Sequence, residues 1–235
     1  MTVKFGTAPG RAALLAAALC VWAMPHQALA QQAPAAQTWN STVSAAPGTT
    51  AVTLDEKQVA TLRRVSTFFN ELKQIRGNFG QTNPDGKRLR GKFAMKQPGR
   101  FRFDYSGGSK MVVVSDGTYL AVEDHDINSE STVELDKTPF RILLRRDVDL
   151  MRDATISEVQ EVDDLIILTI QDKSPDTPGK IRMFLTKKPA LEIKEWVTTD
   201  PQGLETRVEV SDLVRTEELD DAMFKRGSLF TKKLQ

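Results

Sequence analysis

The stretch that decides the fold covers residues 91–105 and reads GKFAMKQPGRFRFDY, with MVVVSDG following at 111–117. Large apolar side chains occupy every second position, with Phe93 and Met95 before a turn and Phe101, Phe103 and Tyr105 after it. An alternation with a period of two is typical of a half-buried β-strand. The stretch therefore predicts strands that place unusually bulky groups on one face of a sheet.

The same period recurs along most of the chain. We predict strands at 75–82, 87–97, 100–106, 110–115, 118–123 and 129–136, and then at 154–162, 164–172, 180–187, 190–199 and 204–213. Turn sequences separate them, such as NPDG at 83–86, where Pro fixes one dihedral angle and Gly supplies a positive one. A meander of about eleven antiparallel strands is expected to curl into a barrel or half-barrel to bury one face.

Two segments depart from this period and predict helices. Thr53 and Glu56 have the spacing of a capping box, and apolar residues then recur every three or four positions as far as 72. This pattern predicts an amphipathic helix packed on the sheet. Thr138-Pro139 suits the start of a second, short helix inserted between strands, whose apolar side holds Phe140, Leu143, Leu144 and Val148.

The N-terminal region resembles an export signal. Lys4 and Arg11 precede and flank a short apolar run, and Ala28-Leu29-Ala30 has the small-x-small form of a cleavage site. We predict a signal peptide at 1–30, a disordered leader at 31–52 and one domain at 53–235, in a soluble periplasmic protein. Cleavage would remove the only cysteine, Cys20, and would change the formal net charge from +1 to −1, a balance that does not favour nucleic-acid binding.

No constellation of residues in the sequence favours catalysis or metal binding. His125 is the only histidine beyond the predicted signal peptide, and its neighbours Asp124 and Asp126 would point to the opposite face of a strand. The chain has no Gly-x-Ser-x-Gly nucleophile elbow and no Gly-rich phosphate loop before a helix. We therefore predict that the protein is not an enzyme and uses no metal and no cofactor.

The apolar strand face is the remaining candidate for function. Aromatic stripes usually fill a core, and the pattern alone leaves open whether this face is a filled core or a pocket. The residues that build it in the predicted strands are Phe79, Phe93, Met95, Phe101, Phe103, Tyr105, Val113, Leu120, Val122, Leu168, Phe184 and Trp196.

The order and spacing of these elements resemble the LolA family of periplasmic outer-membrane lipoprotein carriers. The resemblance rests on Phe79-x-Gln81, Gly91-x-Phe93, the block at 98–105 and VSDG at 114–117, with Thr138-Pro139-Phe140 at the place of the family's lid helix. It covers roughly 59–224. It implies an incomplete antiparallel β-barrel closed by a helical lid, with a cavity for the acyl chains of a lipoprotein.

The resemblance also implies partners and site residues. The partners would be acylated lipoproteins, an inner-membrane ABC lipoprotein-releasing complex and an outer-membrane lipoprotein receptor, with the carrier itself a monomer. Gln97 stands where the family often has an Arg that hydrogen-bonds to the lid, so we predict Gln97 as the lid latch. Two alternatives stay open: a carrier or sensor of other lipids, and a structural module with a filled core. We predict an acyl-binding surface formed by Phe79, Phe93, Met95, Phe101, Phe103, Val113, Leu120, Phe140, Leu143, Leu144, Phe184 and Trp196.

Overall fold

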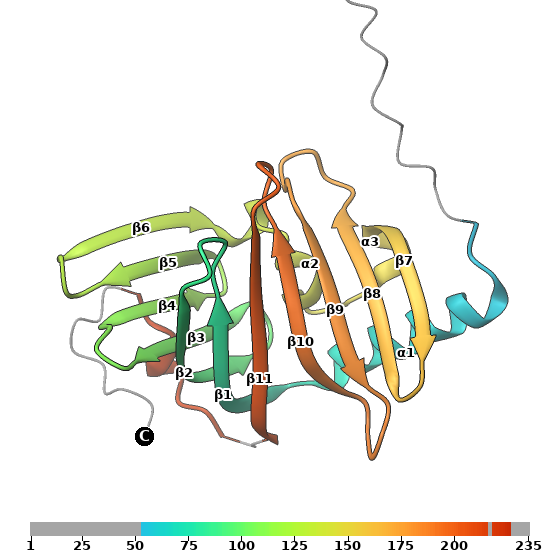
Figure 1. Cartoon of the computed structure of the whole chain (residues 1–235), viewed down its shortest axis with the longest axis horizontal. Helices are drawn as coiled ribbons and strands as arrows, with labels where there is room; N and C mark the ends of the chain where they lie inside the picture. The colour runs from blue at the N-terminus through green and yellow to red at the C-terminus, as the bar shows by residue number, and fades with distance from the viewer. Residues whose placement is uncertain (1–52, 216–217, 227–235) are drawn as a thin grey trace, which may run out of the picture. The chain divides into compact units, whose positions relative to one another are not determined.

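A computed structural model describes residues 53–215 and 218–226. The predicted signal peptide at 1–30 and leader at 31–52 lie outside these residues. Eleven strands form one antiparallel sheet in the order β6-β5-β4-β3-β2-β1-β11-β10-β9-β8-β7 (Figure 1). Among these residues, neither β6 nor β7 pairs with a second strand, so the sheet is open, as predicted for an incomplete barrel.

The chain builds the sheet as two meanders that meet in the middle. The first meander starts at the centre and moves outward through β1 (Gln74–Thr82), β2 (Arg88–Lys96), β3 (Arg100–Ser106), β4 (Met111–Asp116), β5 (Tyr119–Asp124) and β6 (Ser129–Glu134). The second returns from the opposite edge through β7 (Ala154–Val162), β8 (Leu165–Asp172), β9 (Lys180–Thr186), β10 (Glu192–Thr199) and β11 (Glu205–Arg215). Pairing of β1 with β11 joins the two halves.

The connection between the meanders must cross from one edge of the sheet to the other. It contains the 3₁₀ turn η1 (Leu135–Lys137) and the short helices α2 (Arg141–Leu144) and α3 (Leu150–Asp153). These helices and α1 (Glu56–Glu71) lie on one face of the sheet, which we call the inner face (Figure 1). Apolar residues of all three helices join the inner-face strand residues in one core.

Helix α1 begins with a capping box, but at a different position from the one predicted. Asp55 is the N-cap, and its carboxylate accepts a hydrogen bond from the Gln58 backbone N–H while the Gln58 side chain accepts from the Asp55 N–H. Thr53 and Glu56 therefore do not form the predicted box. The amphipathic pattern was interpreted correctly, because Leu62, Val65 and Phe69 on one side of α1 are buried.

The inserted helix is shorter than the sequence suggested. It was expected to start with Thr138 as N-cap, whereas α2 begins at Arg141 and lasts four residues. The Thr138 hydroxyl instead donates to the Leu135 carbonyl oxygen at 2.8 Å, which closes the preceding 3₁₀ turn.

The outer face of β2–β4 carries the end of the described chain. The 3₁₀ turn η2 (Asp221–Phe224) packs there, with Phe224 and Leu219 against Ala94. Arg102 and Asp104 lie beneath this segment as a buried ion pair with an Nη2–Oδ1 distance of 2.9 Å. Arg100 and Arg102, which alternate with Phe101 and Phe103, thus face away from the inner face, and Arg100 pairs with Asp221 of η2.

Candidate functional site

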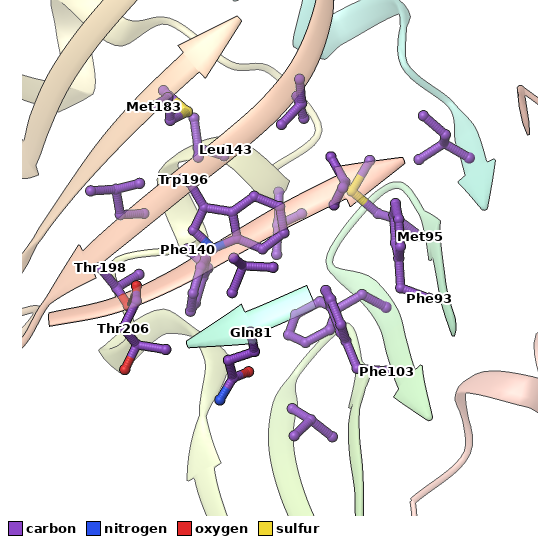
Figure 2. Close-up of a pocket in the computed structure, with 18 of the residues that line it drawn as sticks. Gln81, Phe93, Met95, Phe103, Phe140, Leu143, Met183, Trp196, Thr198 and Thr206 are labelled. Atoms are coloured by element: carbon purple, nitrogen blue, oxygen red, sulfur yellow. Dashed lines mark hydrogen bonds between the residues drawn. The ribbon is translucent and has the colours of Figure 1, made fainter. Parts of the chain in front are cut away.

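The inner face holds a cavity of about 310 Å³ between the sheet and the helices. Its wall is almost entirely apolar and comes from both meanders, from α1 and from the connecting segment. Figure 2 shows side chains of both meanders and of the connecting segment around the cavity. The residues that line it are Phe69, Ile75, Gln81, Phe93, Met95, Phe101, Phe103, Tyr105, Val113, Leu120, Phe140, Leu143, Leu144, Ile181, Met183, Ile193, Trp196, Thr198, Thr206, Val208, Val210 and Leu213.

Phe103 is the centre of an aromatic cluster on the sheet side of the cavity. Its ring stacks on Phe93 with centroids 5.5 Å apart, and it meets Phe101 and Trp196 edge to face at 6.0 and 6.3 Å. Phe93, Phe101 and Phe103 come from the neighbouring strands β2 and β3, whose register pairs Phe93 with Phe103 and Met95 with Phe101. The cluster therefore follows directly from the alternation at 91–105.

Most of the predicted apolar residues lie on this one wall. From the sheet these are Phe93, Met95, Phe101, Phe103, Val113, Leu120 and Trp196, and from the connecting segment Phe140, Leu143 and Leu144. Whether they bind lipid stays a prediction.

Two predicted residues lie elsewhere. Phe79 is buried beneath the wall, with ring contacts to Phe103 and Tyr105 at 5.0 Å each. Phe184 lies on the outer face of β9, where the Arg182 guanidinium sits 5.3 Å from its ring centroid. Its neighbours Ile181 and Met183 face inward instead. The assignment of Phe184 to the cavity was wrong by one residue, because ring size was given more weight than the alternation along β9.

Several wall residues were missed in the sequence. Ile193, Val208, Val210 and Leu213 are ordinary aliphatic residues of β10 and β11, and no feature of the sequence distinguishes them from core. Thr198 could have been assigned to the wall from the sequence, because it is two positions from Trp196 and therefore lies on the same face of the strand.

The connecting segment covers the cavity, and we call residues 138–149 the lid. Gln97 reaches it directly: its Nε2 donates to the carbonyl oxygens of Leu143 at 3.3 Å and of Phe69 at 2.8 Å. The Gly99 N–H also donates to the Leu144 carbonyl oxygen, at 2.7 Å. The turn after β2 is therefore bonded to the carbonyls that end α2. The role of Gln97 as a latch remains a prediction.

The other side of the lid is held by a charged pair. Arg141 binds Asp172 of β8 through two hydrogen bonds, including Nη2 to Oδ1 at 3.0 Å. The Asp172 side chain is fully buried, whereas that of Arg141 is 32% exposed. Burial by itself would raise the pKa of Asp172, but hydrogen bonds from Arg141 and from the Ser174 N–H outweigh it and lower the pKa below the ordinary value.

The end of the lid is tied to α1. The Asn70 side-chain amide donates to the Val148 carbonyl oxygen at 3.0 Å and accepts from the Val148 N–H at 2.8 Å. Asn70 thus forms hydrogen bonds with both the N–H and the carbonyl oxygen of Val148, and these bonds hold the C-terminal end of the lid against α1.

Polar chemistry on the inner face is sparse. The Tyr105 hydroxyl donates to Gln81 Oε1 at 2.6 Å, and burial raises the pKa of Tyr105 to about 12 although this hydrogen bond opposes the shift. The described residues contain no group of three metal-ligating side chains and no helix long and apolar enough to cross a membrane. His125 lies on the other side of the sheet near Glu123, with 3.4 Å between Nε2 and Oε2.

Comparison with known proteins gives consistent matches. Residues 70–227 match the family model described as outer membrane lipoprotein carrier protein LolA. An outer-membrane lipoprotein carrier protein of Leptothrix cholodnii is 26% identical over 167 residues, which cover 67% of this chain and 77% of that protein. The protein of the same description from Chromobacterium violaceum is 26% identical over 175 residues, covering 71% and 83%.

Solved structures also include similar chains. A putative outer membrane lipoprotein-sorting protein domain from Vibrio parahaemolyticus superposes with a TM-score of 0.44 at 9% identity, covering 70% of this chain and 94% of that one. A LolA superfamily protein from Nitrosomonas europaea gives a TM-score of 0.39 at 10% identity, covering 70% and 97%.

Proposed function

Because this chain belongs to the LolA family of outer-membrane lipoprotein carrier proteins, we propose that it shields the acyl chains of lipoproteins and carries them across the periplasm. It would receive its cargo from an inner-membrane ABC complex and pass it to an outer-membrane receptor. The observation that carries the proposal is the apolar cavity of about 310 Å³ under a lid, within the range of volumes of ligand sites in proteins.

The physics of the cargo requires such a cavity. Each methylene exposed to water costs roughly 0.8 kcal/mol, so long acyl chains do not cross an aqueous compartment unescorted. A carrier must also release them, which favours an adjustable wall and a movable cover over a tight pocket. Met95 and Met183 give the wall pliable groups, and the lid supplies the cover.

Export to the periplasm is part of the proposal. It is supported by the signal-like features of residues 1–30, and N-terminal sequencing of the exported protein should find a start near Gln31. A lipidated Cys20 or an uncleaved Met1 would contradict it.

The direct test is to identify what the protein carries. We expect mass spectrometry of the protein purified from the periplasm to find acylated lipoprotein N-termini. Free or terpenoid lipids in their place would favour the alternative of a carrier or sensor for other lipids. No bound lipid at all, and no uptake of an acyl probe, would favour a structural module.

A pair of substitutions tests whether lipoprotein transfer depends on the cavity or on the sheet in general. Phe101→Glu places a charge on the wall and should impair lipoprotein transfer, whereas Phe184→Glu places the same charge on the outer face beside Arg182. We expect only Phe101→Glu to reduce lipoprotein transfer, measured as release of lipoproteins from spheroplasts. Circular dichroism should show that both variants are folded. Equal transfer by the two would remove the cavity from the mechanism, and failure of Phe101→Glu to fold would assign Phe101 to the core.

A further inference from the structure

One end of the cavity differs chemically from the rest. Among the lining residues, the amide of Gln81 and the hydroxyls of Thr198 and Thr206 gather together, away from Phe93 and Met95 (Figure 2). We call these three residues the polar end.

The strand register explains why they meet. Thr198 and Thr206 are directly paired across β10 and β11. Gln81 is paired with Val208, which is the next inner-face residue of β11 after Thr206, so Gln81 and Thr206 are diagonal neighbours. All three lie within two residues of a strand end, beside the turns at 83–87 and 200–204. The polar end is therefore at the rim of the sheet.

The polar end has hydrogen-bond donors to spare. Gln81 Oε1 accepts from Tyr105, and Gln81 Nε2 gives one hydrogen to Asn83 Oδ1 at 2.6 Å, which leaves its second amide hydrogen. Thr198 donates to the Thr206 carbonyl oxygen at 3.3 Å. Within the described part of the chain, no protein group accepts from the Thr206 hydroxyl. A ligand at this end is thus offered neutral donors.

The described residues that line the cavity offer these donors no charged neighbour. None of the lining residues is charged, and the cation nearest in sequence, Arg207, points to the outer face and pairs with Glu195. A carboxylate taken into this site would lose its water without gaining a counter-ion, which is costly, whereas a neutral carbonyl needs only a hydrogen bond.

We propose that the polar end binds the ester carbonyls of a diacylglyceryl group, so that the cavity takes esterified acyl chains in preference to ionised fatty acids. The ester group sits at the rim beside Thr206, and the chains run past Trp196 toward Phe103 and the lid. This inference rests on the proposed function, and it adds which residues hold the ester group and in which direction the acyl chains lie.

Three pyrene-labelled probes of equal chain length test the inference: a neutral diacylglycerol, a fatty acid at pH 8 and an alkane. The unaltered protein should bind the diacylglycerol more tightly than the ionised fatty acid. Thr206→Val removes the hydroxyl at nearly constant shape and should weaken diacylglycerol binding about two- to ten-fold, the value of a net hydrogen bond, while alkane affinity stays within about two-fold. Thr82→Val, the same change on the outer face of β1, should leave all three affinities unchanged.

A second substitution separates hydrogen bonding from shape. Thr206→Ser keeps the hydroxyl and should retain diacylglycerol binding, so equal losses in the Ser and Val variants would overturn the inference. Fatty acid bound as tightly as diacylglycerol, or unchanged diacylglycerol affinity in Thr206→Val, would also overturn it, and alkane binding would then still support the acyl cavity. If the unaltered protein binds none of the probes, the proposed function fails together with the inference.

Discussion

Gln97 joins α1, the residue Lys73 that follows it and the lid through its backbone N–H and one neutral side chain. Its backbone N–H donates to the Lys73 carbonyl oxygen at 2.9 Å, and its amide hydrogens reach Phe69 at the end of α1 and Leu143 in the lid. The amide group can donate a hydrogen bond to each of these two carbonyl oxygens, but it lacks the positive charge and the bidentate geometry of a guanidinium group. The lid is therefore held here by neutral hydrogen bonds, each worth about 0.5–1.5 kcal/mol net.

Substitution of Gln97 should change the rate of lid opening. Gln97→Leu removes the donors and should speed uptake of a fluorescent acyl probe several-fold, whereas Gln97→Arg should favour the closed lid by roughly 1 kcal/mol, since charged hydrogen bonds are worth about 1.5–3 kcal/mol, and slow it. Gln160→Leu, on an exposed position of β7, serves as control. Identical stopped-flow rates for all of these proteins would mean that Gln97 is not the latch.

At this scale the sequence predicted wall residues well where ring size and strand parity agree. Phe93, Phe101 and Phe103 satisfy both and line the cavity. At β9 the two criteria conflict, and parity decides: Met183 is 2% exposed and faces inward, while the larger Phe184 faces outward. The polar end could not be predicted, because Thr and Gln at strand ends are common and only the register between β1, β10 and β11 brings these three together.

The lid is an element that cannot be stable alone. Helix α2 has four residues, which is far below the length at which an isolated helix holds in water. Its position depends on its contacts, namely the burial of Leu143 and Leu144 and the bonds from Gln97, Gly99 and Arg141. The amphipathic pattern at 138–148 predicted a short helix that covers an apolar face of the sheet. It did not predict the hydrogen bonds that hold this helix in place, because their partners are far away in the sequence.

Asp172 gives the lid a pH-dependent anchor. Because its pKa is depressed below 3.8 in the folded protein, its contribution is fully present above that value and is lost as the pH falls through the depressed pKa. We expect acyl-probe uptake to be constant from pH 8 to about 5 and to accelerate below about 4.

Asp172→Asn should reproduce the acidic behaviour at neutral pH. The variant loses the charge-assisted bonds to Arg141, worth about 1.5–3 kcal/mol, and should speed uptake at pH 7 at least several-fold. Asp164→Asn, in an exposed pair with Lys188, should leave the rate unchanged. Slow uptake by Asp172→Asn at every pH would show that the Arg141 contact does not hold the lid.

The start of α1 provides a test of stability at the same scale. Asp55→Ala removes the observed N-cap and should lower the free energy of unfolding by about 1 kcal/mol. Thr53→Ala, at the N-cap position expected from the sequence, should change it by less than about 0.5 kcal/mol. Urea unfolding measures both, and a larger loss for Thr53→Ala would place the cap where the sequence suggested.

At the scale of the whole molecule, the path of the chain produces the cavity. The first meander ends at one edge in β6 and the second starts at the other in β7, so residues 135–153 must cross a face of the sheet. The lid, residues 138–149, is the middle part of that crossing. The number of strands was predictable from alternation and turns, whereas the pairing of β1 with β11, which leaves β6 and β7 at opposite edges, was not. The cavity could not be predicted from the sequence, because its volume depends on how far the lid and α1 stand from the sheet. A sheet with a filled core would show the same alternation of apolar residues.

An occupied cavity should stabilise the entire sheet, because its wall draws on β1–β5 and β9–β11 together with α1 and the lid. A ligand that binds only the folded protein contributes about 2.7 kcal/mol to the free energy of unfolding at a concentration of 100 Kd. For a domain of this size about 1 kcal/mol moves Tm by 2–4 °C, so a saturating diacylglycerol probe should raise Tm by about 5–11 °C in scanning calorimetry.

Two variants serve as controls for this rise in Tm. Phe184→Glu should show the full rise, and Phe101→Glu a much smaller one, since only the charge introduced at position 101 lies in the cavity. A Tm that does not respond to the probe, in a protein shown by fluorescence to bind it, would mean that the ligand sits on the surface and that the inner face is a core like any other.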